Sequence, residues 1–194
     1  MITGAVALWV DPGGPYPGRC AEWYDEQRDA MNYRGMLPVV AHPPCGAWSK
    51  LRHLRNSNAD ARMALRAIDL VRALGGVLEH PAESKLWDAC CLPDPDQPPD
   101  AYGGFALEIA QSDWGHVARK RTWLYVCGCG REQALGILHP PYPGRAPTHW
   151  CSGSRKAPRG PVPPGIKVCS AEQRRRTPPL LADALLLLAC ACGR

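Results

Sequence analysis

A strand–helix–strand pattern between residues 37 and 81 constrains the fold of this chain more than any other feature. An apolar run, Leu37 to Ala41, is bounded by proline and is typical of a buried strand. A helix is predicted over residues 60–74, ended by Gly75-Gly76, and Val77-Leu78 then opens the next strand. One face of that helix carries the apolar residues Met63, Ala67, Ile68, Val71 and Leu74. The unit is expected to be a parallel crossover, which puts the carboxyl ends of both strands at one edge of a sheet.

The rest of the chain extends this pattern. Strands are predicted over residues 5–10 and 121–126, short helices over 21–33 and 104–112, and a last helix after Thr177-Pro178-Pro179. The fold class is therefore α/β, with a mostly parallel central sheet flanked by helices.

The 194 residues fit one domain with a long irregular excursion. Residues 1–138 are predicted to form the catalytic α/β core. Residues 139–168 are rich in proline, glycine and basic side chains and are predicted to be an irregular loop. Residues 169–194 are predicted to be a helical segment that packs on the core.

The net charge of +5 is unevenly distributed. Residues 1–118 hold 10 Lys/Arg against 15 Asp/Glu, whereas residues 119–194 hold 13 against 3. A basic portion of this kind suits a polyanion such as nucleic acid, and it is equally compatible with a solvated basic tail.

Ten cysteines occur without a secretory leader. The apolar run from Leu180 to Cys192 is too short to span a bilayer and contains Asp183, so no membrane segment is expected. The expectation is a cytoplasmic protein with reduced thiols.

Cys45 is the candidate nucleophile. It follows His42-Pro43-Pro44 directly after the strand 37–41, in a stiff loop at the edge where open α/β sheets hold their ligands. A thiolate there can add to an electron-poor carbon, although a buried cysteine is often only a small apolar residue. His42 is interpreted as a loop histidine, with tuning of Cys45 as the alternative.

Glu79 is predicted to lie at the same edge as Cys45. A thiolate can add to carbon 6 of a pyrimidine when a carboxylic acid places a proton on ring nitrogen 3, where negative charge builds up. Carbon 5 then becomes nucleophilic and can attack a one-carbon donor.

Cys127, Cys129, His149 and Cys151 are candidate zinc ligands. Their Cys-x-Cys and His-x-Cys spacings are shorter than structural zinc sites usually have, so no metal site is expected.

Three segments resemble motifs of the DNA cytosine-5 methyltransferases. Pro43-Pro44-Cys45-x-x-Trp48-Ser49 resembles the Pro-Pro-Cys motif, and Leu78-Glu79-His80-Pro81 resembles the Glu-Asn-Val or Glu-Asn-Pro motif. Asp113-Trp114-Gly115-x-x-x-Arg119-Lys120-Arg121 resembles the motif with two arginines. The order of the motifs and the 34-residue step from Cys45 to Glu79 fit as well. The resemblance covers about residues 37–126 and is closest to reduced, phage-type members.

The resemblance implies a role for each matched residue. Cys45 would be the nucleophile and Glu79 the acid at ring nitrogen 3, while Arg119 and Arg121 would orient the base and phosphate. The implied substrate-binding residues are Pro44, Trp48, Ser49, Lys50 and His80. The implied partner is DNA, with the target base flipped out of a duplex, or a pyrimidine nucleotide.

The resemblance also implies S-adenosylmethionine as the cofactor. The family's glycine-rich first loop is replaced here by Leu8-Trp9-Val10-Asp11-Pro12-Gly13-Gly14, so Asp11, Gly13 and Gly14 are the candidate cofactor residues. Two alternatives stay open. One is an enzyme of the thymidylate-synthase type that modifies a free nucleotide with a folate or other donor. The other is a non-catalytic protein with a methyltransferase-like fold that binds nucleic acid.

Overall fold

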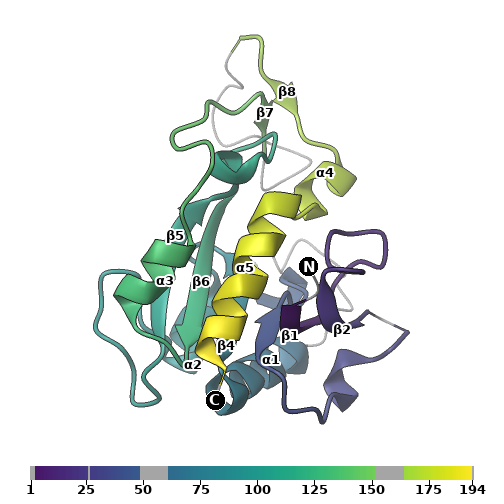
Figure 1. Cartoon of the computed structure of the whole chain (residues 1–194). Coiled ribbons are helices and arrows are strands. Elements are labelled where there is room, and N and C mark those ends of the chain that lie inside the picture. The colour runs from purple at the N-terminus through teal and green to yellow at the C-terminus, as the bar shows by residue number, and fades with distance from the viewer. Residues whose placement is uncertain (1–2, 26, 49–60, 152–163, 194) are drawn as a thin grey trace.

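The computed structural model of the protein describes residues 3–25, 27–48, 61–151 and 164–193. Its centre is a sheet of six strands in the order β2-β1-β3-β4-β6-β5 (Figure 1). The strands are β1 (Thr3–Leu8), β2 (Cys20–Tyr24), β3 (Val39–Ala41), β4 (Gly76–Pro81), β5 (Phe105–Ala110) and β6 (Arg121–Cys127). Neighbours from β2 to β4 pair in parallel, and β6 is antiparallel to both β4 and β5. The α/β class and the mostly parallel sheet are confirmed.

The strand order reverses at β1. The chain passes from β1 to β2 on one side and then to β3 on the other side of β1. Parallel strands on both sides of such a reversal leave a crevice beyond their carboxyl ends, where open α/β sheets bind ligands.

The predicted crossover is confirmed as β3, helix α1 (Ala61–Leu74) and β4. Gly75 ends α1 with φ +79, and β3 and β4 pair in parallel from Val39↔Gly76 to Ala41↔Leu78. A Cβ at Gly76 would lie 2.0 Å from the Val39 carbonyl oxygen, so only glycine allows the two strands this close approach.

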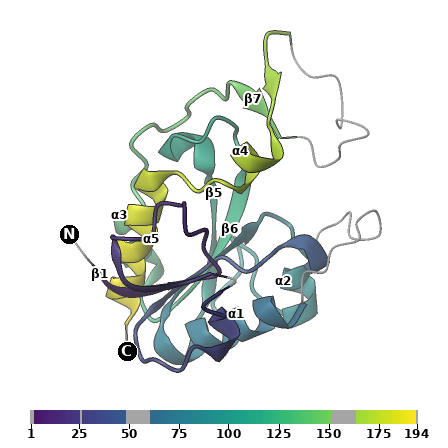
Figure 2. The same cartoon turned by 90° about the vertical axis from the view of Figure 1, so that its right-hand side faces the viewer.

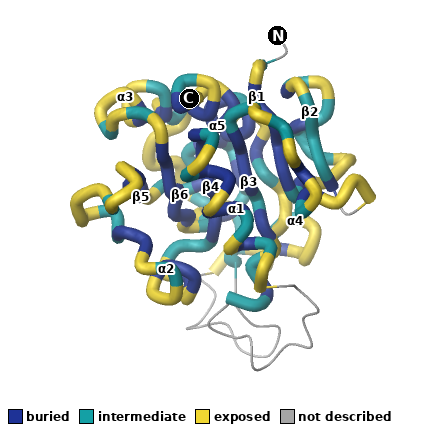
Figure 3. Tube along the Cα trace, turned by 90° about the horizontal axis from the view of Figure 1, so that it is seen from below, coloured by how far each residue is buried: buried dark blue, intermediate teal, exposed yellow. Residues whose placement is uncertain are grey.

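Helices cover both faces of the sheet (Figures 1 and 2). Helix α5 (Pro179–Cys192) packs against β1, β3 and β4, and α3 (Arg131–Ile137) lies beside it. Helices α1 and α2 (Lys85–Cys90) cover the opposite face. The central strands β1, β3, β4 and β6 are largely buried between these layers, as Figure 3 shows from below.

Two predicted helices are wrong. Residues 21–33 form β2 and the single turn η1 (Ala30–Asn32), and residues 104–112 form β5 and the start of η4 (Gln111–Trp114). In both segments pairing with a neighbouring strand outweighs local helix propensity.

The remaining elements lie at one end of the sheet. They are β7 (His149–Trp150), β8 (Lys167–Val168) and α4 (Ala171–Arg175), whose first turn is closed by a capping box of Ser170 and Gln173. In the part of the chain that the structure describes, no helix has both the length and the apolar character that crossing a bilayer requires.

Candidate active site

Two of the predicted site residues, Cys45 and Glu79, lie at the carboxyl edge of β3 and β4. His42 directly follows β3 and donates its backbone N–H to the Leu8 carbonyl of β1 at 3.0 Å. Because Ala41 pairs with Leu78, His42 lies beside Glu79. Cys45 is half-buried three residues further on, directly before the turn η2 (Gly46–Trp48), and Pro44 beside it is exposed. The shared edge of the Cys45 loop and Glu79 follows from the parallel pairing.

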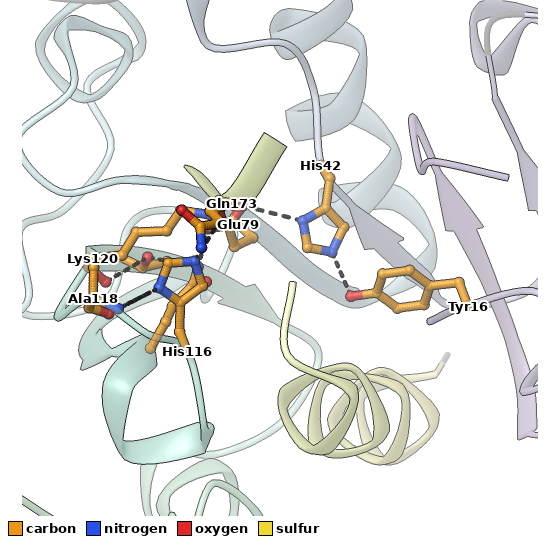
Figure 4. Close-up of polar contacts among 9 residues, drawn as sticks. Tyr16, His42, Glu79, His116, Ala118, Lys120 and Gln173 are labelled. Atoms are coloured by element: carbon orange, nitrogen blue, oxygen red, sulfur yellow. Dashed lines mark hydrogen bonds and ion pairs between the residues drawn. The ribbon is translucent and has the colours of Figure 1, made fainter. Parts of the chain in front are cut away.

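The Glu79 carboxylate is the centre of a polar cluster (Figure 4). Gln111 Nε2 lies 2.9 Å from Glu79 Oε1, and His42 Nδ1 lies 3.1 Å from Oε2. Lys120 Nζ is 3.8 Å from Oε1. Gln111 is fully buried and also donates to the Thr122 hydroxyl at 3.0 Å. Glu79 itself is only 8% exposed, so these groups replace most of its water.

These neighbours keep Glu79 ionised. Burial alone raises the pKa of this carboxyl, but the charge of Lys120 and the hydrogen bond and charge of His42 together lower it well below its ordinary value. The resting site therefore holds an anion next to the Cys45 loop, although the expected role of Glu79 requires a proton.

The backbone of Lys120, whose side chain approaches Glu79, is strained. Its φ is +22, in a region that non-glycine residues rarely adopt. Strain of this kind persists only where the surrounding structure enforces it and is common at functional sites. Here it precedes β6, whose antiparallel pairing with β4 brings Thr122 opposite Pro81.

His42 also contacts Tyr16, which comes from the loop between β1 and β2. The Tyr16 hydroxyl and His42 Nε2 are hydrogen-bonded at 2.5 Å. Tyr16 is 2% exposed, and burial, followed by the charge of Glu79, raises the pKa of its hydroxyl. His42 is thus more than a loop histidine, because it joins Tyr16 to Glu79. The alternative role for His42, tuning of Cys45, stays a prediction.

The two predicted arginines lie away from Glu79. Side chains alternate along β6, so Arg121 points to the face opposite Thr122. Its guanidinium binds Glu108 through two contacts of 2.7 and 2.8 Å and Glu83 through one of 2.9 Å. Arg119 is exposed and its charge acts on Glu108. The positive charge beside Glu79 is instead that of Lys120.

Of the predicted substrate-binding residues, His80 is the most deeply buried. It is 1% exposed, and its ring packs against Trp87 on the face of the sheet opposite Glu79. Burial lowers the pKa of His80 to about 4, so the ring is neutral. Trp48 is half-buried, and its carbonyl accepts from the Ser84 hydroxyl at 3.3 Å. Ser49 and Lys50 lie outside the described residues.

The candidate cofactor residues form a closed turn after β1. Asp11 Oδ1 accepts from the Gly13 N–H at 2.9 Å, and the Asp11 carbonyl accepts from the Gly14 N–H at 2.8 Å. Both glycine donors are therefore used inside the turn, which presents no cradle of unused N–H groups to S-adenosylmethionine. The turn does not fit the family's cofactor loop, and no catalytic step is derived through it.

The structure does not bring the four candidate zinc ligands together. Cys127 pairs with Gly76 at one end of β6, whereas His149 lies near Ala118 beyond the other end. Cys129 Sγ contacts Cys192 Sγ at 2.8 Å, and Cys151 Sγ contacts Cys169 Sγ at 3.4 Å. Among the described residues no three His, Cys, Asp or Glu side chains form a metal-binding group.

Sequence reasoning missed Tyr16, Gln111 and Lys120 as parts of the site. Lys120 lies inside the motif that carries the two arginines. Residues two apart along a strand share a face, so the spacing of Lys120 and Thr122 was the signal in the sequence that could have identified Lys120. Gln111 follows a segment interpreted as helix, and Tyr16 lies in a loop, so neither position could be placed from periodicity.

Comparison of the chain with protein-family models, with curated proteins and with solved structures gave no match, so the assignment of a function depends on the site itself.

Proposed function

We propose that the protein modifies carbon 5 of a pyrimidine by adding the Cys45 thiolate to carbon 6 of the ring. The observation that carries this proposal is the buried Glu79 carboxylate, held by Gln111, Lys120 and His42 at the same sheet edge as the Cys45 loop. A nucleophile and a group that can serve ring nitrogen 3 are the two requirements of this chemistry. The resemblance to DNA cytosine-5 methyltransferases supports the same roles.

The reaction proceeds through a covalent adduct. The Cys45 sulfur bonds to carbon 6, the ring π electrons shift toward nitrogen 3, and Glu79 delivers a proton there. Carbon 5 takes up a one-carbon group from the donor, the remainder of which departs, and then loses its own proton to water. The sulfur leaves carbon 6 as the double bond reforms, and nitrogen 3 returns its proton to Glu79.

The proposed partner is DNA. The basic portion of the chain begins at Arg119, next to the site, and His116 ties the basic helix α4 to this region. His116 Nδ1 contacts the Ala118 carbonyl at 2.9 Å, and its Nε2 contacts the Gln173 carbonyl at 2.8 Å. A polyanion bound by this portion in the cytoplasm would lie close to Glu79. The roles of Arg119, Arg121, Pro44, Trp48 and His80 toward such a substrate stay predictions.

Trapping with a 5-fluoropyrimidine tests the nucleophile. Once carbon 5 has taken up the one-carbon group, fluorine cannot leave it as a cation, so in the presence of the one-carbon donor the enzyme should remain covalently joined to DNA containing the fluorinated base. We expect a denaturation-resistant adduct with the wild type and none with Cys45→Ala. Cys190→Ala, an exposed cysteine on α5, is the matched control and should trap normally. The absence of an adduct on both DNA and free nucleotides would refute the proposal.

The donor is a separate part of the proposal. S-adenosylmethionine would supply a methyl group, as the resemblance implies, and a folate would supply a one-carbon unit to a nucleotide. The closed turn at Asp11, Gly13 and Gly14 weakens the first choice without favouring a particular folate site. Calorimetric titration with each donor, with and without the trapped base, decides between them.

One observation also favours non-catalytic binding to nucleic acid, namely the excess of 13 Lys/Arg over 3 Asp/Glu after residue 118. This alternative predicts salt-sensitive binding to DNA that Cys45→Ala leaves unchanged and no covalent adduct with any fluorinated base.

A further inference from the structure

We propose that His42, oriented by Tyr16, supplies the proton that Glu79 gives to the base, and that this makes the site competent for cytosine. The inference rests on the proposed function, and it adds two positioning residues, Tyr16 and His42, that neither the family motifs nor the sequence reasoning assigned to proton supply. It follows from a continuous hydrogen-bonded chain, Tyr16–His42–Glu79 (Figure 4).

The hydrogen-bonded chain Tyr16–His42–Glu79 is sheltered from water. The side chain of His42 is 11% exposed and that of Glu79 is 9% exposed. Tyr16 lies inside the core cluster beneath α5, so its hydroxyl holds His42 Nε2 from the interior. His42 Nδ1 is thereby directed at Glu79 Oε2, 3.1 Å away. A histidine fixed through both ring nitrogens, one of them on a carboxylate, has its proton aimed along a single path.

Cytosine needs this proton and uracil does not. Nitrogen 3 of neutral cytosine carries a lone pair, so it requires a protonated partner when the thiolate adds to carbon 6. Nitrogen 3 of uracil carries a hydrogen, which an ionised carboxylate accepts directly. Glu79 is ionised at rest, so a cytosine-specific reaction requires a nearby proton source. His42 is the group in direct hydrogen-bond contact that can give one.

The transfer balances without an outside reactant. The proposed step starts from the imidazolium form of His42, with Nδ1–H on Glu79 and Nε2–H on the Tyr16 oxygen. The Nδ1 proton passes to the Glu79 carboxylate and then to nitrogen 3 as the Cys45–carbon 6 bond forms. His42 becomes neutral and keeps Nε2–H on Tyr16. The proton returns by the same route when the sulfur leaves.

Other groups that face the chain do not duplicate this role. Lys120 acts on Glu79 through its charge but lies 3.8 Å away, and the ring of His80 is neutral and points to the opposite face. Cys20 and Asp183 face Tyr16 and only disfavour its ionisation. Gln111 donates to Glu79 but has no titratable proton.

The test compares, in the presence of S-adenosylmethionine and, separately, of a folate donor, covalent trapping on DNA containing 5-fluorocytosine with trapping on DNA containing 5-fluorouracil. In His42→Asn the amide nitrogen lies where Nδ1 lies, so a hydrogen bond to Glu79 can persist while the transferable proton is lost. We expect its trapping rate to fall about 100-fold or more on 5-fluorocytosine and to change by less than about twofold on 5-fluorouracil. Tyr16→Phe should show the same selectivity with a smaller loss, about tenfold.

Tyr33→Phe is the matched control. Tyr33 is also buried, and its hydroxyl accepts one hydrogen bond, from the Leu37 N–H at 3.1 Å, away from the site. Tyr33→Phe should leave the trapping rates on both fluorinated bases unchanged. Equal slowing of both substrates by His42→Asn and Tyr16→Phe means a purely structural role and overturns the inference, as does no slowing of either. Wild type that traps only 5-fluorouracil also overturns it. Wild type that traps neither base refutes the proposed function itself, and the wild-type lanes alone reveal that failure.

Discussion

Burying a carboxylate as deeply as Glu79 costs several kcal/mol unless charges and hydrogen bonds replace its water. Here Lys120, His42 and Gln111 come from three separate parts of the chain and converge on one side chain. Such convergence is more than a strand end requires, because a solvated glutamate at that position would need no partner. The arrangement instead holds a carboxylate in a fixed position with a histidine ring nitrogen on one of its oxygens.

Lys120→Met should destabilise the ionised form of Glu79. The native pKa of Glu79 is lowered from 4.5, so ionisation stabilises the fold above that pH, and this stabilisation is lost as the pH falls through the native pKa. Without Lys120 the native pKa rises, and acid unfolding should begin at higher pH. At neutral pH the variant should be less stable by about 1–3 kcal/mol, the cost of removing one partner of a buried polar group.

Acid unfolding followed by tryptophan fluorescence measures this effect. Lys167→Met, at an exposed lysine of β8, is the control and should leave the acid transition in place. If the two variants unfold at the same pH as the wild type, Lys120 does not stabilise the Glu79 anion.

At the scale of elements, the C-terminal helix α5 holds the site from one side. It packs across β1, β3 and β4, and Tyr16 lies in the same apolar cluster. Parallel pairing brings the carboxyl ends of the strands to one edge of the sheet. The helices that cover the sheet hold these strands in position relative to one another. The position of the Tyr16–His42–Glu79 chain therefore depends on this packing.

Leu185→Ala should destabilise the protein by about 2–5 kcal/mol, because it leaves a cavity between α5 and the sheet. Leu185 is completely buried, whereas Leu187 on the same helix is 56% exposed. Leu187→Ala is thus a matched control and should change stability by less than about 0.5 kcal/mol. Chemical denaturation with urea measures both, and similar losses in the two variants would contradict the packing described.

Elements with a clear period were predictable from the sequence, and elements shaped by their partners were not. The 3.6-residue period of α1 and the Gly75-Gly76 stop placed β3, β4 and the edge shared by Cys45 and Glu79. The segment Phe105–Ala110 contains good helix formers and became a strand because β6 pairs with it. Gln111 and Lys120 meet Glu79 only through the antiparallel pairing of β6, which no local pattern specifies.

At the scale of the whole molecule, the charge changes sign at the site. The acidic portion ends at Ala118, and the basic portion begins with Arg119 and continues through β8 and α4. The contact of His116 with the Gln173 carbonyl fixes α4 to the loop before Lys120. A nucleic acid bound by the basic portion, as we propose, would thereby lie near the edge that holds Cys45 and Glu79.

Replacing Arg175 and Arg176 with alanine should weaken DNA binding and its dependence on salt. Both arginines are exposed, and the ion pair of Arg176 with Glu172 is solvent-exposed and contributes little to stability. Removing an arginine that binds a phosphate should lower the slope of log affinity against log salt by about 1, measured by fluorescence anisotropy over a salt series.

Arg28→Ala with Arg34→Ala removes two exposed arginines from the acidic portion and should leave the slope unchanged. If both double variants lower the slope equally, net charge alone governs binding and α4 is not the contact surface. If neither does, the basic portion is a solvated tail.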